Sequence, residues 1–317
     1  MNAALWLPLA LAVAGCATAR ARGPHEITLE GKADRFVVHD GTELFTEFIF
    51  HNDPKPILYP LLAPGGVAVT RDWPMVESSD EPHDHPHHQS LWFAHGSVNG
   101  HDFWSSPNGE KIVHATSAGQ YLEDGAEIVS VHLWQIEGGH TLCRERRRMR
   151  FSAAEDGRRI DFTFELAPAA EALVFGDTKE GTFALRLAPS LALTGDGAQG
   201  HALNSAGERD ADCWGKRAAW IEYSGPVEGH VVGVALLEHP ANFRHPTWWH
   251  ARDYGLVAAN PFGVHDFEQK PAGTGDFTLA PGETLTLRYR LWLHEGTADA
   301  AALAREFERY AAQPIPK

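Results

Sequence analysis

The chain has 317 residues, of which 43% are hydrophobic and 22% are charged, and its formal net charge at pH 7 is −15. These values are typical of a globular protein with a large core. The densest basic run, "RERRRMR" (144–150), alternates like a strand, and no longer Lys/Arg run is present to follow a phosphate backbone. The composition therefore argues against nucleic acid as a partner.

The N-terminal residues predict a secreted lipoprotein. The stretch "MNAALWLPLALAVAGCATAR" has no acidic side chain, and its apolar run ends in Ala14-Gly15-Cys16. A short apolar segment before small residues is typical of a signal peptide rather than a membrane-spanning helix. Because Cys16 follows Ala-Gly as in a bacterial lipobox, we predict a signal peptide at 1–15, lipid attachment to Cys16 and a tether at 16–26. Ala17 is not an aspartate, so we expect a periplasm-facing lipoprotein at the outer membrane; a secreted protein cleaved elsewhere is the alternative.

Alternating segments recur along the rest of the chain and predict an all-β fold. They are "TELFTEFIF" (42–50), "SLWFAHG" (90–96), "EIVSVHLWQIEG" (127–138), "RRIDFTFELA" (158–167), "GTFALRLAP" (181–189), "HVVGVALLEH" (230–239) and "ETLTLRYRLWLHEG" (283–296). Period-two patterning without strand–helix–strand alternation favours antiparallel strands. We predict one large antiparallel β-sandwich over 27–317, with a C-terminal helix at 297–312 capped by Thr297. Whether Cys143 and Cys213 form a disulfide stays open.

Histidines gather just before one of these strands. The stretch "EPHDHPHHQSLWFAHGSVNGHDFW" (81–104) holds six of the nineteen histidines. Imidazole is the side chain best suited to proton transfer near neutral pH. Loops at strand ends carry many functional groups, so we predict a site with His87, His88 and His95 as acid–base residues. The alternative is a set of separate surface or structural histidines.

Imidazole is also the commonest transition-metal ligand, so the same stretch allows a second hypothesis. A divalent or transition metal would be held by His85, His87 and His88. No regular motif such as His-Glu-x-x-His is present, so we keep proton transfer as the first interpretation.

Two later stretches add candidate groups. "GDTKEG" (176–181) places Lys179 and Glu180 in a turn before a strand, where Glu180 would serve as a general base or be one charge of an exposed turn. "NFRHPTWWHARDYG" (242–255) sets two tryptophans among His and Arg, a pattern compatible with a sugar cleft or with a packed loop. The predicted substrate-binding residues are Trp92, Asn99, Asp102, Trp104, Lys179, His245, Trp249, His250 and Arg252.

Three stretches resemble a known family. "HPHHQSLWFAHGSVNGHDFW", "FGDTKEGTFALRLAPSL" (175–191) and "HPANFRHPTWWHARDYGLVAANPFG" (239–263) are similar to the PmoA-like family of secreted bacterial proteins. That family takes its name from a methane oxygenase subunit, and the resemblance carries no assigned activity.

A second resemblance is to galactose mutarotases. "HGSVNGHDFW" (95–104) is similar to their His-Gly-Gly stretch, and "LAPGETLTLRYRLWL" (279–293) resembles their closing strand. This resemblance implies a supersandwich fold and a substrate-contacting His95. Where the mutarotases carry an Asn-His motif with their general acid, this chain has Lys179 and Glu180.

These observations together predict a lipid-anchored protein that acts on a sugar or glycoside by His/Glu acid–base chemistry, as an epimerase, hydrolase or lyase. Three alternatives stay open: a non-catalytic sugar-binding lipoprotein, a metal-dependent oxygenase, and a structural envelope protein without a site.

Overall fold

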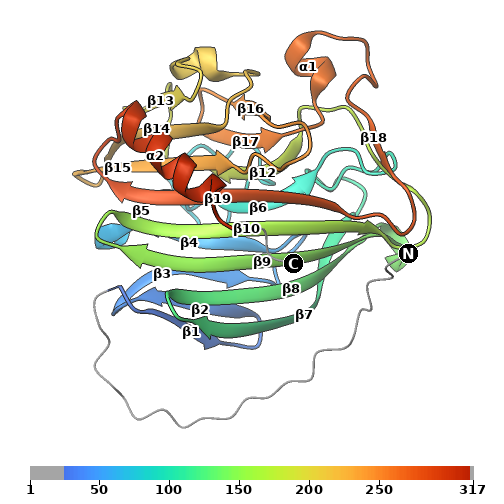
Figure 1. Cartoon of the computed structure of the whole chain (residues 1–317), viewed down its shortest axis with the longest axis horizontal. Coiled ribbons are helices and arrows are strands. Elements are labelled where there is room, and N and C mark those ends of the chain that lie inside the picture. Colours follow the sequence, from blue (N-terminus) through green and yellow to red (C-terminus); the bar gives the residue numbers. More distant parts are fainter. Residues whose placement is uncertain (1–24, 315–317) are drawn as a thin grey trace.

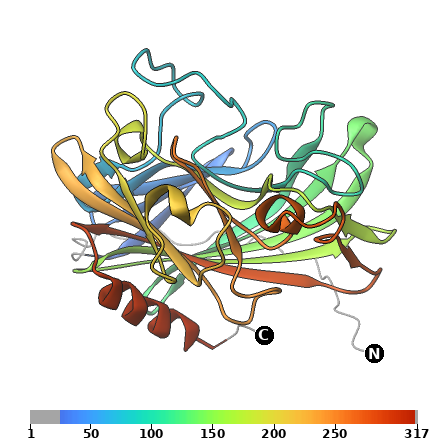
Figure 2. The same ribbon diagram turned by 90° about the horizontal axis from the view of Figure 1, so that it is seen from above.

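The computed structural model describes residues 25–314, and the predicted signal peptide and lipidated Cys16 lie outside this range. Within it, the strands form a nine-stranded sheet, an eight-stranded sheet and a two-stranded sheet, all antiparallel. The two large sheets pack face to face (Figures 1 and 2). The predicted antiparallel β-sandwich is therefore confirmed. No helix in the described range is long and apolar enough to cross a membrane.

The nine-stranded sheet runs in the order β1-β2-β3-β4-β6-β12-β17-β16, with β5 paired to β4. Its strands are β1 (Ile27–Gly31), β2 (Arg35–Asp40), β3 (Glu43–Ile49), β4 (Ile57–Ala63), β5 (Val67–Ala68), β6 (Leu91–His95), β12 (Gly181–Arg186), β16 (Trp248–Ala251) and β17 (Leu256–Asn260). The three segments β6, β12 and β17 are neighbours in space although far apart in sequence.

The eight-stranded sheet runs in the order β13-β14-β15-β19-β10-β9-β8-β7. Its strands are β7 (Lys111–Leu122), β8 (Gly125–Gln135), β9 (Thr141–Ala154), β10 (Gly157–Pro168), β13 (His201–Asn204), β14 (Trp220–Val227), β15 (His230–Glu238) and β19 (Leu285–Glu295). The small sheet pairs β11 (Leu173–Phe175) with β18 (Phe277–Leu279). Short 3-10 helices occupy Pro64–Gly66, Glu137–Gly139, Pro189–Leu191 and Asp210–Cys213, and α1 spans Val264–Glu268.

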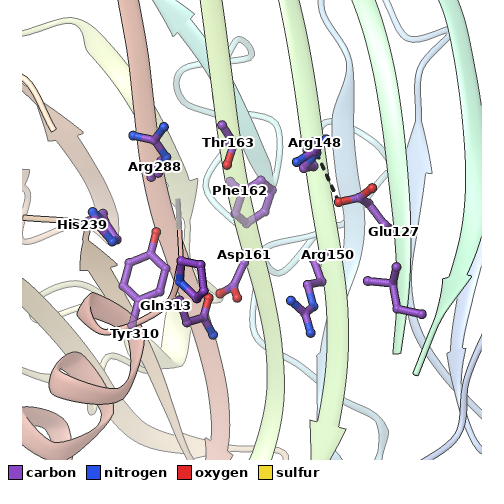
Figure 3. A pocket seen from close by; sticks show the side chains of 12 residues that line it. Glu127, Arg148, Arg150, Asp161, Phe162, Thr163, His239, Arg288, Tyr310 and Gln313 are labelled. Atoms are coloured by element: carbon purple, nitrogen blue, oxygen red, sulfur yellow. Dashed lines mark ion pairs between the residues drawn. The ribbon is translucent and has the colours of Figure 1, made fainter. Parts of the chain in front are cut away.

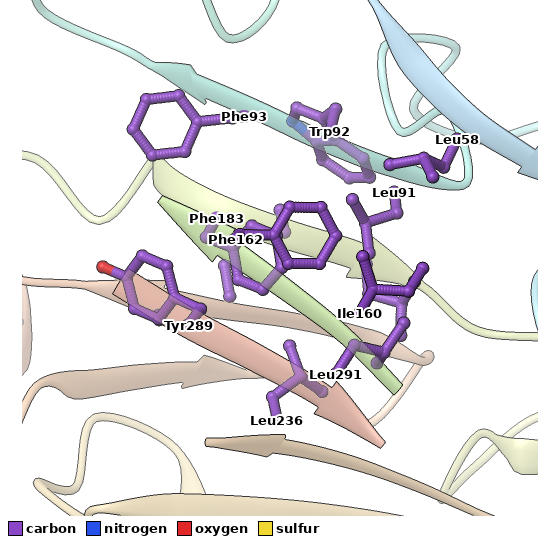
Figure 4. Close-up of a cluster of buried hydrophobic side chains, with 14 of the residues drawn as sticks. Leu58, Leu91, Trp92, Phe93, Ile160, Phe162, Phe183, Leu236, Tyr289 and Leu291 are labelled. Atoms are coloured by element: carbon purple, nitrogen blue, oxygen red, sulfur yellow. The ribbon is translucent and has the colours of Figure 1, made fainter. Parts of the chain in front are cut away.

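The core lies between the two large sheets and follows from the alternation of side chains along each strand. Phe93 of β6 stacks on Phe164 of β10, with ring centroids 3.9 Å apart. Phe183 of β12 stacks in the same way on Tyr289 of β19, at 4.8 Å. Figure 4 shows these two layers of side chains meeting. Cys143 and Cys213 are buried with free thiols, so they do not pair with each other.

The C-terminal helix α2 (Ala300–Ala311) lies on the outer face of the eight-stranded sheet (Figure 1). The predicted helix is thus confirmed, but its cap is Asp299, whose carboxylate accepts a hydrogen bond from the Ala302 amide, rather than Thr297. Leu303 and Tyr310 of the helix pack against Trp220 and Trp292 of the sheet. Leu303 and Tyr310, which lie two helical turns apart, therefore mark the buried face of the helix.

Candidate active site

A cleft of about 430 Å³ lies over the outer face of the nine-stranded sheet. It is formed by the loops before and after β6, the turn before β12, and the β16–β17 hairpin. We call it the histidine cleft. Its lining residues are His85, His87, His88, Asp102, Trp104, Ser105, Lys179, Glu180, His250, Arg252 and Tyr254. The volume is in the range of sites that hold a small molecule.

Two buried arginines hold the histidine loop in place. Arg71 is 1% exposed; it donates to a carboxylate oxygen of Asp84 at 2.5 Å and to the carbonyl oxygens of Asp84 and His85, both at 2.9 Å. Arg186 of β12 donates to the two carboxylate oxygens of Asp84 at 3.0 and 3.2 Å. Burial alone would raise the pKa of Asp84, but the two arginines outweigh it and lower this pKa to about 2. These contacts hold His85 at a left-handed φ of 44°, which a side chain rarely adopts.

The loop rings form a stack beneath the cleft. His85 lies parallel to His88, with centroids 4.7 Å apart and planes 2° apart, and His88 in turn stacks on Trp92 at 5.3 Å. Tyr254 also lies parallel to His85, with ring centroids 5.2 Å apart. Burial, together with the neighbouring cations and histidines, holds the pKa of His88 well below its usual range. Neutral His88 accepts a hydrogen bond from Arg186 at Nδ1, so its proton is on Nε2.

His87 lies within electrostatic reach of charged groups from three other segments, those that carry Lys55, Asp102 and Glu180. Burial lowers its pKa to about 4, with further lowering from Lys55 and His85. Glu180 and Asp102 act in the opposite direction, which requires both carboxylates to lie within electrostatic reach of the ring. At pH 7 His87 is therefore a neutral imidazole with a free lone pair, placed near two carboxylates.

Glu180 reaches the cleft through a close approach of two backbones. The Gly96 amide donates to the Glu180 carbonyl at 2.7 Å, and a Cβ at Gly96 would lie 2.8 Å from Cβ of Glu180. Only glycine fits at this position. The Glu180 carboxylate accepts a hydrogen bond from the Lys179 ammonium at 2.6 Å. The His-Gly pair at 95–96 thus serves to bring β6 against the turn that carries Glu180.

Three residues that line the cleft carry buried nitrogens without a hydrogen-bond partner in the described range: His88 Nε2, Trp104 Nε1 and His250 Nδ1. Burial lowers the pKa of His250 to about 3, so its ring is neutral as well. An unpaired buried polar group typically costs about 1–3 kcal/mol. Groups retained at such a cost are candidates for bonding to the hydroxyls of a ligand.

The structure brings together most of the residues that the sequence pointed to. His87, His88, Glu180 and the predicted substrate-binding residues Asp102, Trp104, Lys179, His250 and Arg252 all line the histidine cleft. They come from segments separated by up to about 160 positions in the chain, and antiparallel pairing of β6, β12, β17 and β16 gathers them on one face.

The expectation that His95 joins this cleft is wrong. His95 points into the core between Phe175 and Phe262, is fully buried, and Nε2 contacts the Gly176 carbonyl at 2.8 Å. Burial lowers its pKa to about 4. Its ring lies against Gly181, where a Cβ would come within 2.4 Å of Nδ1.

Four predicted substrate-binding residues also lie outside the cleft lining. Trp92 is fully buried beneath His88 and Trp104, so it supports the cleft without facing it. Asn99 bonds to the backbone of Ala172 and Val174. His245 pairs with buried Glu238 at 2.9 Å. Trp249 faces the core and donates to the Ala218 carbonyl, because adjacent residues of β16 point to opposite faces.

The proposed metal ligands are not arranged for a metal. Within residues 25–314 no group of three or more His, Cys, Asp or Glu side chains could hold a metal ion. His85 and His88 lie face to face, so their in-plane lone pairs do not converge on one point.

Sequence analysis missed several residues of this region. Tyr254 lies between two guanidinium groups, those of Arg186 at 4.6 Å and Arg252 at 5.4 Å. Lys55 is fully buried and donates to the Trp104 carbonyl at 2.7 Å. Burial lowers the pKa of Lys55 to about 7, although nearby Asp102 raises it. The sequence did contain one indication of this region, because Arg186 is a charged residue inside the apolar strand "GTFALRLAP".

Comparison with protein families gives one match. Residues 35–308 match the "Family of unknown function (DUF6807)". The chain belongs to this family. The resemblance to the PmoA-like family finds no support in the comparisons, and no curated protein sequence matches the chain.

Solved structures similar to this chain include three sugar-related proteins. A galactose mutarotase-like protein from Lactobacillus casei is 10% identical, with 84% of this chain and 100% of that chain covered and a TM-score of 0.34. A putative aldose 1-epimerase from Escherichia coli K12 is 13% identical, with 85% and 99% covered and a TM-score of 0.32. A glycoside hydrolase family 97 enzyme from Pseudoalteromonas is 9% identical, with 85% and 34% covered and a TM-score of 0.38. At these identities and TM-scores, the similarity carries no argument about substrate or reaction.

Proposed function

We propose that the histidine cleft binds a carbohydrate and that the protein is an enzyme acting on it by acid–base chemistry. The observation that carries the proposal is the meeting of neutral His87 with the carboxylates of Glu180 and Asp102 in one cleft. These groups come from three separate segments. A cleft that combines a few polar groups with aromatic walls is typical of a small-molecule site.

A sugar matches the polar groups of the cleft. Each sugar hydroxyl both donates and accepts hydrogen bonds. The unpaired nitrogens of His88, Trp104 and His250 offer both donor and acceptor positions for such hydroxyls. The half-buried ring of Tyr254 supplies apolar surface for the C–H face of a pyranose, and fully buried Trp104 packs beneath the cleft.

The acid–base roles follow from protonation states at pH 7. His87 is neutral and can accept a proton from a sugar hydroxyl or carbon. Glu180, held by Lys179, is a second proton acceptor. Burial raises the pKa of Tyr254, so its phenol stays protonated and can donate to a ring or leaving oxygen. Epimerisation, hydrolysis and elimination all use one acceptor and one donor in this way.

The test compares three variants in which a titratable side chain is replaced by glutamine. Glu180→Gln and His87→Gln should bind the same glycans on an array as the wild type but lose about 10²–10⁴ in rate. Rates would be followed by NMR of anomer exchange, by reducing-end release and by absorbance of unsaturated products. The matched control is His83→Gln, an exposed histidine of the same loop that does not line the cleft.

The outcomes separate the alternatives. A wild type that binds glycans without turning over any of them would be a non-catalytic sugar-binding protein. A wild type that binds no glycan, or Glu180 and His87 variants that behave like the His83 control, would contradict the proposal.

The proposal includes an envelope location, which rests on the sequence of residues 1–17 alone. Lipid on Cys16 would anchor the mature chain, with residues 17–26 as a tether, facing the periplasm at the outer membrane. Cys16→Ser should then abolish incorporation of labelled palmitate. Equal labelling of wild type and variant would contradict the anchor and leave the histidine cleft untouched.

A further inference from the structure

A second depression, of about 560 Å³, lies on the outer face of the eight-stranded sheet (Figure 3). The histidine cleft lies over the other large sheet, on the opposite side of the sandwich. Strands β8, β9, β10 and β19 form the floor of the second depression, and the C-terminal end of α2 forms one wall. We call it the arginine groove, after Arg148, Arg150 and Arg288 in its lining. None of these residues belongs to the chemistry described above.

The floor consists of cross-strand rows in which arginine and acid alternate. Arg146 of β9 lies opposite Glu165 of β10, and the two form an ion pair at 2.9 Å. Two rows further along, Asp161 lies opposite Arg290 of β19 and pairs with it at 2.6 Å. In both rows β10 supplies an acid for a neighbouring arginine, as expected for a stable exposed sheet face.

The row between these two breaks the pattern. Here β10 supplies Thr163, which lies opposite Arg148 on one side and Arg288 on the other. Arg148 has a partner in Glu127 at 3.2 Å. Arg288 has no ion pair or side-chain hydrogen bond within residues 25–314, and its Nε is buried. The acid that acts on it electrostatically, Glu165, is already paired with Arg146.

Two further donors accompany Arg288. Tyr310 of α2 is 3% exposed, and its hydroxyl has no partner in the described range. In Figure 3 this hydroxyl points along the groove toward the side of Arg288 and His239. His239 accepts a hydrogen bond from the Ala241 amide at Nδ1, so the neutral ring carries its proton on Nε2. A guanidinium, a phenol and an imidazole N–H thus line one groove. The two carboxylates that also line it, Asp161 and Glu127, are already paired with Arg290 and Arg148.

We propose that the arginine groove is a second binding site, which takes the carboxylate group of a small organic anion. Arg288 would hold the two carboxylate oxygens, and Tyr310 would donate a further hydrogen bond. A net charge of −15 gives no general attraction for anions, so the local unpaired guanidinium must supply it. The groove is larger than a carboxylate alone and leaves room for the body of an acid or an acidic sugar.

The experiment is a calorimetric titration of the full chain with hexanoate, glucuronate and glucose. Wild type should bind at least one of the two carboxylates and should bind glucose more weakly at this site. Binding of both acids would indicate a general carboxylate site, and binding of glucuronate alone would indicate an acidic sugar. Arg288→Met and Tyr310→Phe should each weaken carboxylate binding by about tenfold or more, because each removes a hydrogen bond to a charged group.

Two controls make the result specific. Arg144→Met removes an exposed arginine of β9 that does not line the groove, and it should leave carboxylate affinity unchanged. Glu180→Gln alters the histidine cleft and should also leave it unchanged, so this proposal and the proposed function can fail separately. The proposal is overturned if wild type binds neither acid at millimolar concentration. It is also overturned if Tyr310→Phe raises the melting temperature without loss of affinity, since the hydroxyl would then be only a buried unpaired group.

Discussion

The two outer faces of the sandwich are built in different ways. On the nine-stranded sheet, long loops cover the strands and place neutral histidines over buried aromatic rings. On the eight-stranded sheet, long regular strands present arginines that are mostly matched by acids. The first face carries imidazoles that are neutral at pH 7 and can accept a proton or a hydrogen bond from a ligand, whereas the second carries fixed charge. This difference is the basis on which we propose chemistry for the histidine cleft and anion binding for the arginine groove.

Acid should distinguish the two faces most strongly. Burial lowers the pKa values of His87, His88, His95 and His250, to about 4 for His87 and His95 and about 3 for His250. In the unfolded chain these rings take up protons near pH 6.5, whereas the folded protein does not. Stability should therefore fall as the pH drops below about 6.5, by up to about 1.4 kcal/mol per pH unit for each ring. Together they should remove several kcal/mol between pH 7 and pH 5.

Urea unfolding at pH 7 and pH 5 measures this loss of stability, and an unchanged midpoint would contradict it.

The ion pairs of the opposite face respond at lower pH. Burial alone would raise the pKa of Glu306, but Arg159, Arg309 and Arg290 lower it to about 2. The stability that ionised Glu306 contributes is lost only as the pH falls from about 4.5 toward 2. Hydrogen exchange at pH 5 should consequently rise first around the histidine loop.

Loss of a single arginine should lower the free energy of unfolding by less than the change from pH 7 to pH 5 does. The size of this loss should again depend on which face carries the arginine. Arg71→Met should lower the free energy of unfolding by about 3 kcal/mol, because it leaves the loop carbonyls of Asp84 and His85 without their donor. Arg150→Met removes an arginine from an exposed pair with Asp124 and should cost less than about 1 kcal/mol. Equilibrium denaturation compares the two, and equal losses would show that Arg71 does not organise the histidine loop.

The sandwich could be predicted because period-two alternation directly fixes which side chains face the core. The same alternation rule predicts that His95 faces the core, as the structure shows. It shares a strand face with Leu91 and Phe93, and both of these are buried against the other sheet. The resemblance to galactose mutarotases favoured a substrate role instead. Alternation was the better guide at this residue.

The cleft itself could be predicted only in part. His87 and Glu180 were found because polar groups at strand ends are conspicuous in sequence. Tyr254, Arg71 and Arg186 were missed because the register of β6, β12 and β17 brings them together, and no local pattern encodes that register. The adjacent Trp248 and Trp249 must face opposite sides, but which one faces the core depends on pairing with β17.

The smallest of the expected effects concerns His95. His95→Leu removes its hydrogen bond to the Gly176 carbonyl and should lower stability by about 1–2 kcal/mol. Glycan affinity should stay at the wild-type value, since the ring lies on the core side of β6. A binding titration beside thermal unfolding measures both quantities. Loss of glycan affinity with unchanged stability would return His95 to the site.

The most direct test of the carbohydrate cleft is a crystal structure of Glu180→Gln with a glycan selected on the array. We predict the sugar ring in the histidine cleft, with a hydroxyl within hydrogen-bond distance of His87, about 2.6–3.2 Å, and of Gln at position 180. The sugar should also contact at least one of the unpaired nitrogens of His88, Trp104 and His250. A glycan bound elsewhere, with the histidine cleft empty, would contradict the account.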